Sequence, residues 1–270
     1  MTIRDLQLRF QRGRIPFTAC RADARFSYCL YIPQALLDEP ERRRPLVVVV
    51  HGSGRTAESY RDYFIEFAEQ HACVVLVPLF PLGVPALEPH DGYKMRYKSR
   101  VRFDSVLLSM VAEVSENYAV EARFSLYGFS GGAQFAHRFF YLHPERLRAL
   151  SLAAPGHITL IDPTRDWPDG TANIQHTFDC HPVDLVVMQD VAIQLVIGSQ
   201  DNETLHDPLT GRRYTRQQHV QRLAHNYTSL GLAVETVTVQ GVGHDGFSLL
   251  PHSQAFLSRF MSAPDMVRLC

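Results

Sequence analysis

The strongest constraint on the fold is a series of short apolar runs, each of strand length, that alternate with stretches of helical spacing. The run Pro45–Val50 is continuously apolar and rich in valine, which is typical of a strand covered on both faces. Further runs are Ala72–Pro78, Arg123–Tyr127, Ala149–Ala153, Ala192–Ile197 and Val234–Val239. Strands that alternate with helices predict right-handed βαβ units on a mostly parallel sheet.

Apolar residues spaced three and four apart predict helices between these strands. The predicted helices are 59–70, Asp104–Tyr118, Ala133–Leu142, Thr215–Leu230 and Ser248–Met261. Asp104 is placed to cap the second of them. Ahead of these elements, Ile15–Cys20 and Arg25–Ile32 alternate apolar and polar residues, as antiparallel strands do. About eight strands in all predict one three-layer α/β domain over residues 1–270, with helices on both faces of the sheet.

The composition narrows the possible partners. A hydrophobic content of 46% and a charged content of 20% are ordinary for a globular protein. The net charge of −1 gives no electrostatic reason to expect a nucleic acid or an anionic membrane as partner. The longest apolar runs are of strand length, far short of the roughly 18 residues that span a bilayer. We therefore expect binding to neither nucleic acid nor membrane.

The N-terminus and the cysteines favour a cytoplasmic location. The first residues carry charges but no apolar segment of the kind found in a secretory signal. The five cysteines form no CxxC pair, and their odd number argues against a disulfide framework. Cys20 and Cys29 could face each other in the opening hairpin, but two buried thiols are the preferred interpretation.

Two long segments have little periodicity. Leu79–Arg102 is rich in Pro, Gly and Tyr and is interpreted as a long loop. Residues 156–189 contain several prolines and the only tryptophan, Trp167. We predict that this second segment forms a small cap inserted into the domain.

Four of the predicted strands are followed by glycine-rich polar residues at their carboxyl ends, where ligand sites form in a parallel sheet. These motifs are His51–Gly54, Gly128–Gly132, Gly198–Asp201 and Gln240–Gly246. They bring Ser130, Asp201 and His244 to one edge of the sheet, in the chain order nucleophile, carboxylate, imidazole. A Gly-x-Ser-x-Gly pattern alone is a weak signal, but the strand–turn–helix context and this order are those of a nucleophile elbow.

With these motifs the chain resembles the α/β-hydrolases. Its local sequence is similar to the esterase branch that contains polyhydroxybutyrate-depolymerase-like and feruloyl-esterase-like proteins. The resemblance rests on VVVVHGSG, DSVLLSMVAEVSENY, RFSLYGFSGGAQFAHR, HPERLRALSLAAPG, IGSQD and GVGHDG. It covers nearly the whole chain, and it implies an α/β-hydrolase fold with serine-hydrolase chemistry.

Each proposed catalytic residue has a chemical reason. Ser130 needs an adjacent base, because a serine hydroxyl is a poor nucleophile at neutral pH. His244 is the predicted general base and acid, since imidazole titrates near working pH. Asp201 is predicted to fix the histidine tautomer and to stabilise the imidazolium. Other carboxylates close by in the sequence are Glu203, Asp207 and Asp245, of which Asp245 is interpreted as a neighbouring loop residue.

Backbone N–H groups are the usual donors to the oxyanion of a tetrahedral intermediate. Gly131, just after the nucleophile and at a helix N-terminus, is predicted to supply one. Ser53 is predicted to supply the other, with Gly52 as the competing choice. His51 is interpreted as a hydrogen-bonding support of this loop, and Arg55 as a solvated arginine.

Loops after the strands are expected to form the substrate pocket. The candidate pocket residues are Tyr60, Tyr93, Trp167 and Phe178. Aromatic side chains suit an apolar or aromatic acyl or alcohol group, although Trp167 could equally pack the insertion onto the domain. The polar group His176, Asp179, Cys180 and His181 matches no metal-ligand spacing, so we expect neither a metal nor a cofactor.

The leading hypothesis is therefore an enzyme that hydrolyses a small-molecule carboxylic ester through an acyl-serine intermediate. A second hypothesis uses the same residues on an amide, peptide, lactone or C–C bond. The third is a non-catalytic binding protein on this fold, for which the loss of one of the three catalytic residues would be the signature.

Overall fold

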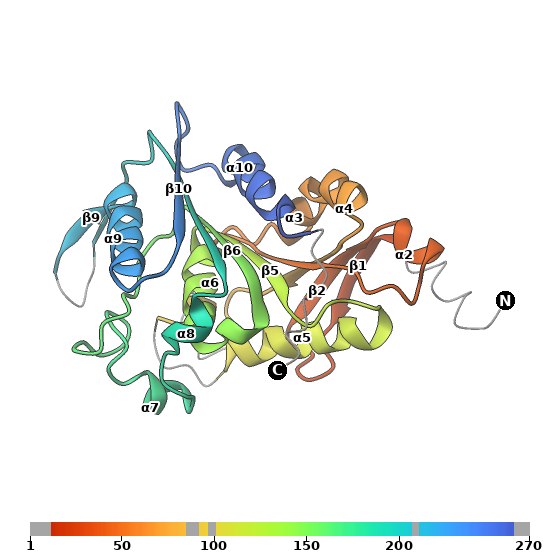
Figure 1. Cartoon of the computed structure of the whole chain (residues 1–270), viewed down its shortest axis with the longest axis horizontal. Helices are drawn as coiled ribbons and strands as arrows, with labels where there is room; N and C mark the ends of the chain where they lie inside the picture. The colour runs from red at the N-terminus through yellow and green to blue at the C-terminus, as the bar shows by residue number, and fades with distance from the viewer. Residues whose placement is uncertain (1–11, 85–91, 97–100, 207–210, 262–270) are drawn as a thin grey trace.

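The computed structural model describes residues 12–84, 92–96, 101–206 and 211–261 of the chain (Figure 1). The described residues form a central sheet in the order β1-β2-β4-β3-β5-β6-β7-β10. Its strands are β1 (Gly13–Ala19), β2 (Ser27–Ile32), β3 (Leu46–Val50), β4 (Val74–Leu79), β5 (Phe124–Phe129), β6 (Leu147–Ala153), β7 (Ala192–Gly198) and β10 (Val234–Val239). β1 and β2 are antiparallel at one edge, and the other strands are parallel. The predicted mostly parallel sheet with an opening hairpin is confirmed.

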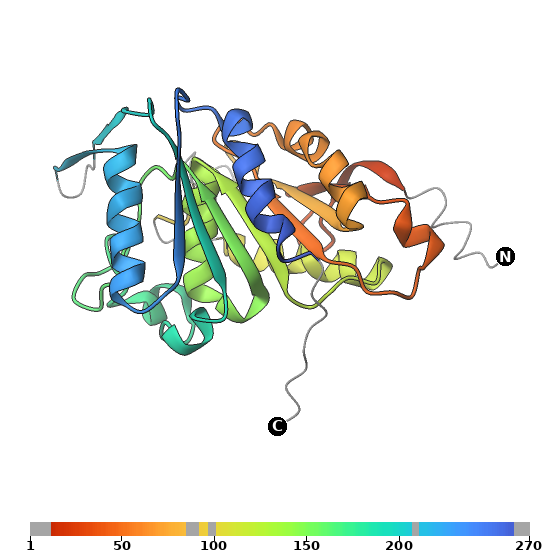
Figure 2. The same cartoon turned by 45° about the horizontal axis from the view of Figure 1, so that its top comes forward.

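Helices cover both faces of this sheet and complete three layers, as Figure 2 shows. On one face lie α3 (Ala57–Tyr63), α4 (Ile65–His71) and α10 (Gly246–Ser258). On the other face lie α5 (Phe103–Asn117), α6 (Gly131–Leu142) and α9 (Arg216–Ser229). The hydroxyl of Tyr227 in α9 donates to that of Tyr141 in α6, so these two helices pack side by side on the same face.

Shorter elements lie in the connections. They are α2 (Ala35–Asp38), η1 (Gly92–Lys94), η2 (Pro144–Arg146), α7 (Ile174–Phe178), α8 (Leu185–Met188), β8 (Thr204–His206) and β9 (Arg213–Thr215). β8 and β9 pair as a separate antiparallel hairpin between β7 and α9. The sequence predicts no strands here, because three-residue strands are too short to show alternation.

The core lies between the sheet and its two helical layers. In β3, Val47–Val50 are fully buried, because helices cover this strand on both faces. Burial extends around almost the whole of α6, including its polar side chains His137 and Arg138. This central position of β5 and α6 holds the turn between them rigidly.

Two local predictions are wrong. The single helix expected over residues 59–70 is broken into α3 and α4, which meet at the fully buried Phe64. Asp104 does not cap α5 but lies in its first turn, where its buried carboxylate contacts Arg102 and His143. Its contact with His143, 39 residues away in the chain, is one that local spacing does not reveal.

The predicted insertion, residues 156–189, contains α7 and α8 and is otherwise irregular. The buried guanidinium of Arg138 in α6 donates Nε–H to Thr159 Oγ1 at 2.9 Å. Asn226 of α9 makes two hydrogen bonds with the backbone of Ile161. The segment is thus attached to two helices of the domain, and its role as a cap over substrate stays a prediction.

Within the described ranges, no helix is long and apolar enough to cross a bilayer. Cys20 and Cys29 are both free and buried. The interpretation of this pair as two buried thiols is confirmed.

Candidate active site

Ser130 lies in the tight turn between β5 and α6. Its backbone φ is 53°, in the left-handed region that residues with a side chain rarely adopt. The turn requires glycine on both sides of the serine. A Cβ on Gly128 would lie 2.3 Å from the carbonyl oxygen of Gly132, and a Cβ on Gly132 would lie 2.1 Å from that of Val50. The predicted strained strand-to-helix turn is confirmed.

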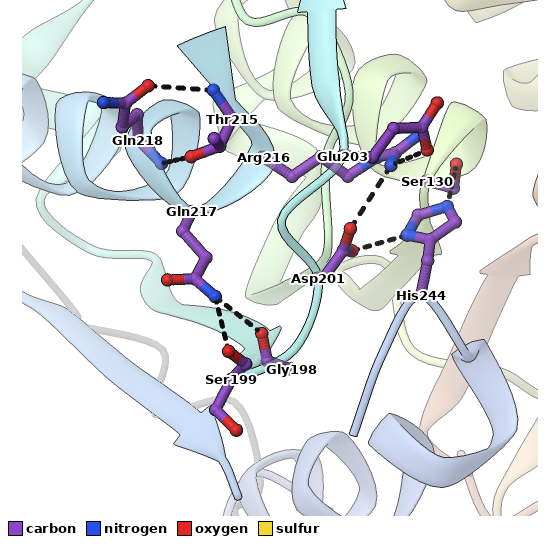
Figure 3. Close-up of polar contacts among 10 residues, drawn as sticks. All are labelled: Ser130, Gly198, Ser199, Asp201, Glu203, Thr215, Arg216, Gln217, Gln218 and His244. Carbon is purple, nitrogen blue, oxygen red and sulfur yellow. Dashed lines mark hydrogen bonds and ion pairs between the residues drawn. The ribbon is translucent and has the colours of Figure 1, made fainter. Parts of the chain in front are cut away.

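The loops after β7 and β10 bring a carboxylate and an imidazole to this serine (Figure 3). His244 Nε2 lies 3.0 Å from Ser130 Oγ, and His244 Nδ1 lies 2.6 Å from Asp201 Oδ2. The side chain of Asp201 is buried, whereas that of His244 is 27% exposed. The three residues selected from chain order therefore lie in hydrogen-bonding contact, with the histidine in the middle.

The first turn of α9 fixes the loop that carries Asp201 (Figure 3). Gln217 Nε2 donates to backbone carbonyl groups at the end of β7, with 2.8 Å to Ser199. Arg216 Nη1 lies 3.3 Å from Asp201 Oδ1. Burial raises the pKa of Asp201, but the hydrogen bond from His244 and the charge of Arg216 outweigh burial and hold the pKa below its ordinary value. Asp201 is therefore ionised at neutral pH.

The neighbouring carboxylates have other contacts. Glu203 pairs with Arg216. Asp245 caps α10, with Oδ1 accepting the N–H of Phe247 at 3.0 Å, in agreement with its interpretation as a loop residue. Asp207 lies outside the described residues.

His51 is buried at the end of β3, with both ring nitrogens bound to backbone. Nδ1 lies 2.8 Å from the carbonyl oxygen of Gly52, and Nε2 accepts the N–H of Phe80 at 3.2 Å. Because Nε2 is the acceptor, the ring proton is on Nδ1. Burial lowers the pKa of His51 to about 4. His51 is thus a neutral support of the loop, as expected.

This support also sets the direction of the Ser53 amide. The carbonyl oxygen of Gly52 accepts from the His51 ring and from the N–H of Arg55 at 3.0 Å. In a trans peptide the C=O and N–H groups point to opposite sides, so the Ser53 N–H points out of this turn. Gly131 is close by, since a Cβ on it would lie 3.0 Å from Ser53 Oγ. Neither amide donates a hydrogen bond to another residue that the structure describes.

Two of the aromatic pocket candidates are buried against glycines of the site. Tyr93 is 2% exposed, and its hydroxyl oxygen lies 2.2 Å from where a Cβ on Gly131 would be. Tyr60 is 3% exposed, and its hydroxyl oxygen lies 2.3 Å from where a Cβ on Gly246 would be. Its ring packs on Phe247 with centroids 4.9 Å apart. Both tyrosines thus shape the backbone around Ser130 and His244. Their contact with a substrate stays a prediction.

The other two candidates pack against each other, with the ring centroids of Trp167 and Phe178 4.8 Å apart. The indole N–H of Trp167 donates to the carbonyl of Met95 at 2.8 Å, and its ring lies near the guanidinium of Arg138. These contacts favour the interpretation in which Trp167 packs the insertion onto the domain. A substrate contact of either ring stays a prediction.

Two cations lie close to the serine turn. Arg55, interpreted as a solvated arginine, is partly exposed and is also held by backbone: its Nε donates to the carbonyl of Phe80 at 2.9 Å, and its Nη1 to that of Ser53 at 2.7 Å. Lys94, which sequence reasoning missed, has its Cε 2.9 Å from where a Cβ on Gly131 would be. Its place beside Tyr93 in the sequence was the only signal for it.

Sequence reasoning also missed Arg216, although a signal existed. The predicted helix from Thr215 puts Arg216 in a first turn, where a positive charge opposes the helix dipole. An arginine at such a position needs a carboxylate partner.

Among the described residues, no cluster of three or more His, Cys, Asp or Glu side chains could hold a metal ion.

The sheet topology, the strained serine turn and the strand-end loops define an α/β-hydrolase fold. Among solved structures, the chain is similar to LpqC, a poly(3-hydroxybutyrate) depolymerase from Bordetella parapertussis. The identity is 22%, the match covers 97% of this chain and 94% of that chain, and the TM-score is 0.71.

Two other solved structures are similar. Poly(aspartic acid) hydrolase-1 from Sphingomonas sp. KT-1 is 19% identical, with 85% of this chain and 92% of that chain covered and a TM-score of 0.65. A ferulic acid esterase is 12% identical, with 93% of this chain and 100% of that chain covered and a TM-score of 0.64. No protein-family model and no curated protein matches the sequence. The predicted fold class is confirmed, and esterases and depolymerases are among its structural neighbours, as the resemblance implied.

Proposed function

We propose that this chain is a serine hydrolase that cleaves a carboxylic ester through an acyl-enzyme intermediate. The observation that carries the proposal is the pair of contacts of His244, 3.0 Å from Nε2 to Ser130 Oγ and 2.6 Å from Nδ1 to Asp201 Oδ2. An ionised carboxylate at Nδ1 keeps the proton on that nitrogen and leaves the Nε2 lone pair facing the hydroxyl. Ser130 thus has the adjacent base that it needs.

The chemistry follows from these positions. His244 Nε2 accepts the hydroxyl proton as Ser130 Oγ attacks the ester carbonyl carbon. When the tetrahedral intermediate collapses, the bond to the alcohol breaks and the imidazolium returns its proton to the leaving oxygen. Water, deprotonated by the same imidazole, then attacks the acyl-serine carbonyl carbon. The bond from that carbon to Ser130 Oγ breaks, the imidazolium returns its proton to Oγ, and the carboxylic acid is released. Asp201 stays ionised throughout and stabilises the imidazolium.

The amides of Ser53 and Gly131 are the proposed oxyanion donors. The carbonyl of Gly52 is turned toward His51, which favours the Ser53 N–H over that of Gly52. Gly131 opens α6, where the first N–H groups have no partner within the helix. Removal of one such donor costs about 3 kcal/mol of transition-state stabilisation in other enzymes.

The names of two structurally similar proteins favour an ester as the substrate. One similar structure is a depolymerase of poly(3-hydroxybutyrate), which is a polyester, and another is a ferulic acid esterase. The net charge of −1 offers no attraction to polyanions. We therefore keep a small-molecule ester as the proposed substrate. The cytoplasmic location, proposed from the N-terminal sequence and the cysteines, stays a prediction.

A second candidate is cleavage of an amide bond by the same residues. The similar structure from Sphingomonas is named a hydrolase of poly(aspartic acid), whose units are joined by amide bonds. A panel of p-nitrophenyl esters of increasing chain length, run beside p-nitroanilide and aminopeptidase substrates, separates the two. Faster turnover of the amides would replace the first candidate by the second.

The mechanism is tested by covalent labelling with a fluorophosphonate, followed by mass spectrometry of the digested protein. We expect one adduct, on the peptide that contains Ser130, and none in the Ser130→Ala variant. An adduct at another serine would contradict the assignment of the nucleophile. A folded wild-type protein that neither reacts nor cleaves any ester would instead favour the non-catalytic hypothesis.

A further inference from the structure

We propose that Arg216 is a positioning residue of the candidate active site. It holds the Asp201 carboxylate by the oxygen that His244 does not use, and its charge sets the acid side of the pH–rate profile. The inference rests on the proposed hydrolase function, because it concerns the acid of that Ser–His–Asp arrangement.

The two carboxylate oxygens of Asp201 have separate partners (Figure 3). Oδ2 lies 2.6 Å from His244 Nδ1, and Oδ1 lies 3.3 Å from Arg216 Nη1. The side chains of Asp201 and Arg216 are 1% and 9% exposed, so water does not replace either contact readily. Rotation of the carboxylate would break both charge-assisted hydrogen bonds at once. Arg216 thus keeps Oδ2 aimed at the imidazole.

Arg216 is itself held in place by the start of α9. Its N–H donates to the carbonyl of Glu203 at 3.2 Å, and its Nη1 contacts the Glu203 carboxylate. Thr215 and Gln218 form a capping box around it: Thr215 Oγ1 accepts the N–H of Gln218, and the N–H of Thr215 donates to Gln218 Oε1 at 2.8 Å. These reciprocal bonds fix the helix end, and with it the base of the arginine side chain.

Charged and titratable groups approach the imidazole and the serine turn from several elements. They are Asp201 and Glu203 after β7, Arg216 in α9, Asp245 beside the histidine, Arg55 before α3, Tyr60 in α3, and Tyr93 and Lys94 in η1. Among the described residues, Arg216 is the cation in contact with Asp201. Its charge makes a second positive charge on the imidazole less favourable, whereas the carboxylate of Glu203 makes it more favourable.

Because Arg216 and Glu203 carry opposite charges, removal of one or the other should shift the pH–rate profile in opposite directions. Arg216→Met removes a positive charge with little change in volume. The acid limb, which is the low-pH side of the plot of kcat/KM against pH, should therefore move to higher pH by on the order of half a unit to one unit. We also expect kcat to fall about tenfold, with KM nearly unchanged, because a misplaced aspartate impairs the transition state rather than binding. Both are measured with a p-nitrophenyl ester from about pH 5 to 9.

Glu203→Gln removes a negative charge from the same group, and the acid limb should therefore move down. The shift should be smaller and should shrink at high salt, because the Glu203 side chain is 59% exposed. Arg216→Lys keeps the charge but not the planar fork of the guanidinium. It should restore the position of the acid limb while kcat recovers only in part.

Arg148→Met is the matched control. It removes a partly buried ion pair, with Nη2 2.7 Å from Glu121 Oε2, at the start of β6 and away from the serine turn. We expect a lower melting temperature and an unmoved acid limb. A shift equal to that of Arg216→Met would show that the limb reports general destabilisation and would overturn the proposal.

The remaining outcomes are distinct. Acid limbs that move in the same direction in Arg216→Met and Glu203→Gln, or that move in neither, overturn the role of Arg216 while ester cleavage by the wild type stands. If Arg216→Met does not fold, two other measurements test the proposal: the shift of the acid limb in Glu203→Gln and the reduced kcat of Arg216→Lys. If neither effect is seen, the proposal is overturned. A wild-type protein that cleaves no ester overturns the proposed function and this inference together.

Discussion

In two clusters of the described residues, a buried aspartate lies between a histidine and an arginine. The edge cluster is Asp201, His244 and Arg216, and the helix cluster is Asp104, His143 and Arg102. In the edge cluster, the second ring nitrogen of the histidine faces Ser130 Oγ at 3.0 Å. In the helix cluster, it faces Glu145 at 3.9 Å. The same three residue types thus lie against a serine hydroxyl in one place, and against a further carboxylate and the rings of Phe139 and Phe178 in the other.

The arginines also bind differently. Arg102 uses two nitrogens on the two oxygens of Asp104, at 3.0 and 2.7 Å, and His143 shares the second oxygen at 2.9 Å. Arg216 contacts one oxygen of Asp201 and leaves the other to His244. A bidentate pair gives a rigid anchor, whereas a single contact leaves one oxygen to direct the imidazole. The difference predicts stability for the helix cluster and catalysis for the edge cluster.

Ser130→Ala should have the largest effect, because it removes the group that distinguishes the two clusters. We expect ester turnover to fall by about 10⁴- to 10⁶-fold. The melting temperature should stay near that of the wild type, since the alanine occupies the same strained backbone. Steady-state kinetics and a thermal melt measure both. Retained turnover would show that the edge cluster serves another nucleophile or none.

The two aspartates should give crossed results when each is changed to asparagine. Asp201→Asn should lower kcat by roughly 10³- to 10⁴-fold through loss of the correct histidine tautomer. The change in stability should be modest, because Arg216 keeps the carboxylate of Glu203 as a partner. Asp104→Asn should destabilise the fold by about 2 kcal/mol, because the fully buried side chain loses its charge-assisted hydrogen bonds with Arg102 and His143, and should leave kcat/KM nearly unchanged. Urea unfolding and kinetics on both variants test this.

A reversed pattern, with activity lost in Asp104→Asn and stability lost in Asp201→Asn, would break the comparison. Asp207→Asn is the control for the choice of acid, because this carboxylate follows closely in the sequence. If it were more damaging to kcat than Asp201→Asn, the edge cluster would have a different acid.

Asp201 and His244 of the edge cluster could be predicted from the sequence, whereas Arg216 was missed and the helix cluster could not be predicted. Ser130 and Asp201 each follow a buried strand, and His244 follows β10, the partly exposed strand at the sheet edge. Parallel strands bring their carboxyl ends to one edge. Strand order and the glycines around the serine were therefore enough to select them. No such rule joins Asp104 to His143, because their contact depends on how α5 and α6 pack.

The same limit explains the other misses. Arg138 and His137 are fully buried in α6, although helix patterning assigns charged residues to an exposed face. Their polar atoms bind backbone of η1 and of residues 157–159, far along the chain. Buried polar residues with distant partners leave no periodic signal, and they carry the attachments that shape the site.

Acid unfolding sharpens the contrast further. Burial raises the pKa of Asp104, but hydrogen bonds from His143 and Arg102 outweigh it and lower the pKa from 3.8 to about 2. A carboxyl group whose pKa is lower in the folded than in the unfolded protein stabilises the fold at pH values above its unfolded pKa. This stabilisation is lost as the pH falls through the folded pKa. The contribution, roughly 2 kcal/mol, should thus disappear between about pH 4 and pH 2.

Urea unfolding of the wild type and Asp104→Asn over this pH range measures the contribution. The difference in unfolding free energy between the two proteins should narrow as the pH falls. Curves that stay parallel down to pH 2 would show that Asp104 is not the titrating group.

His143→Gln should have the smallest effect and tests whether the helix cluster is purely structural. The glutamine amide can still donate a hydrogen bond to Asp104, so the variant loses only ring packing and part of one charged contact. We expect a loss of about 1 kcal/mol in unfolding free energy and an unchanged kcat/KM. The corresponding change at the edge cluster, His244→Gln, removes the base and should lower kcat nearly as far as Ser130→Ala does. A fall in kcat/KM of more than about threefold in His143→Gln would mean that the helix cluster acts on the serine turn through α6, and the division between an anchoring and a catalytic cluster would not hold.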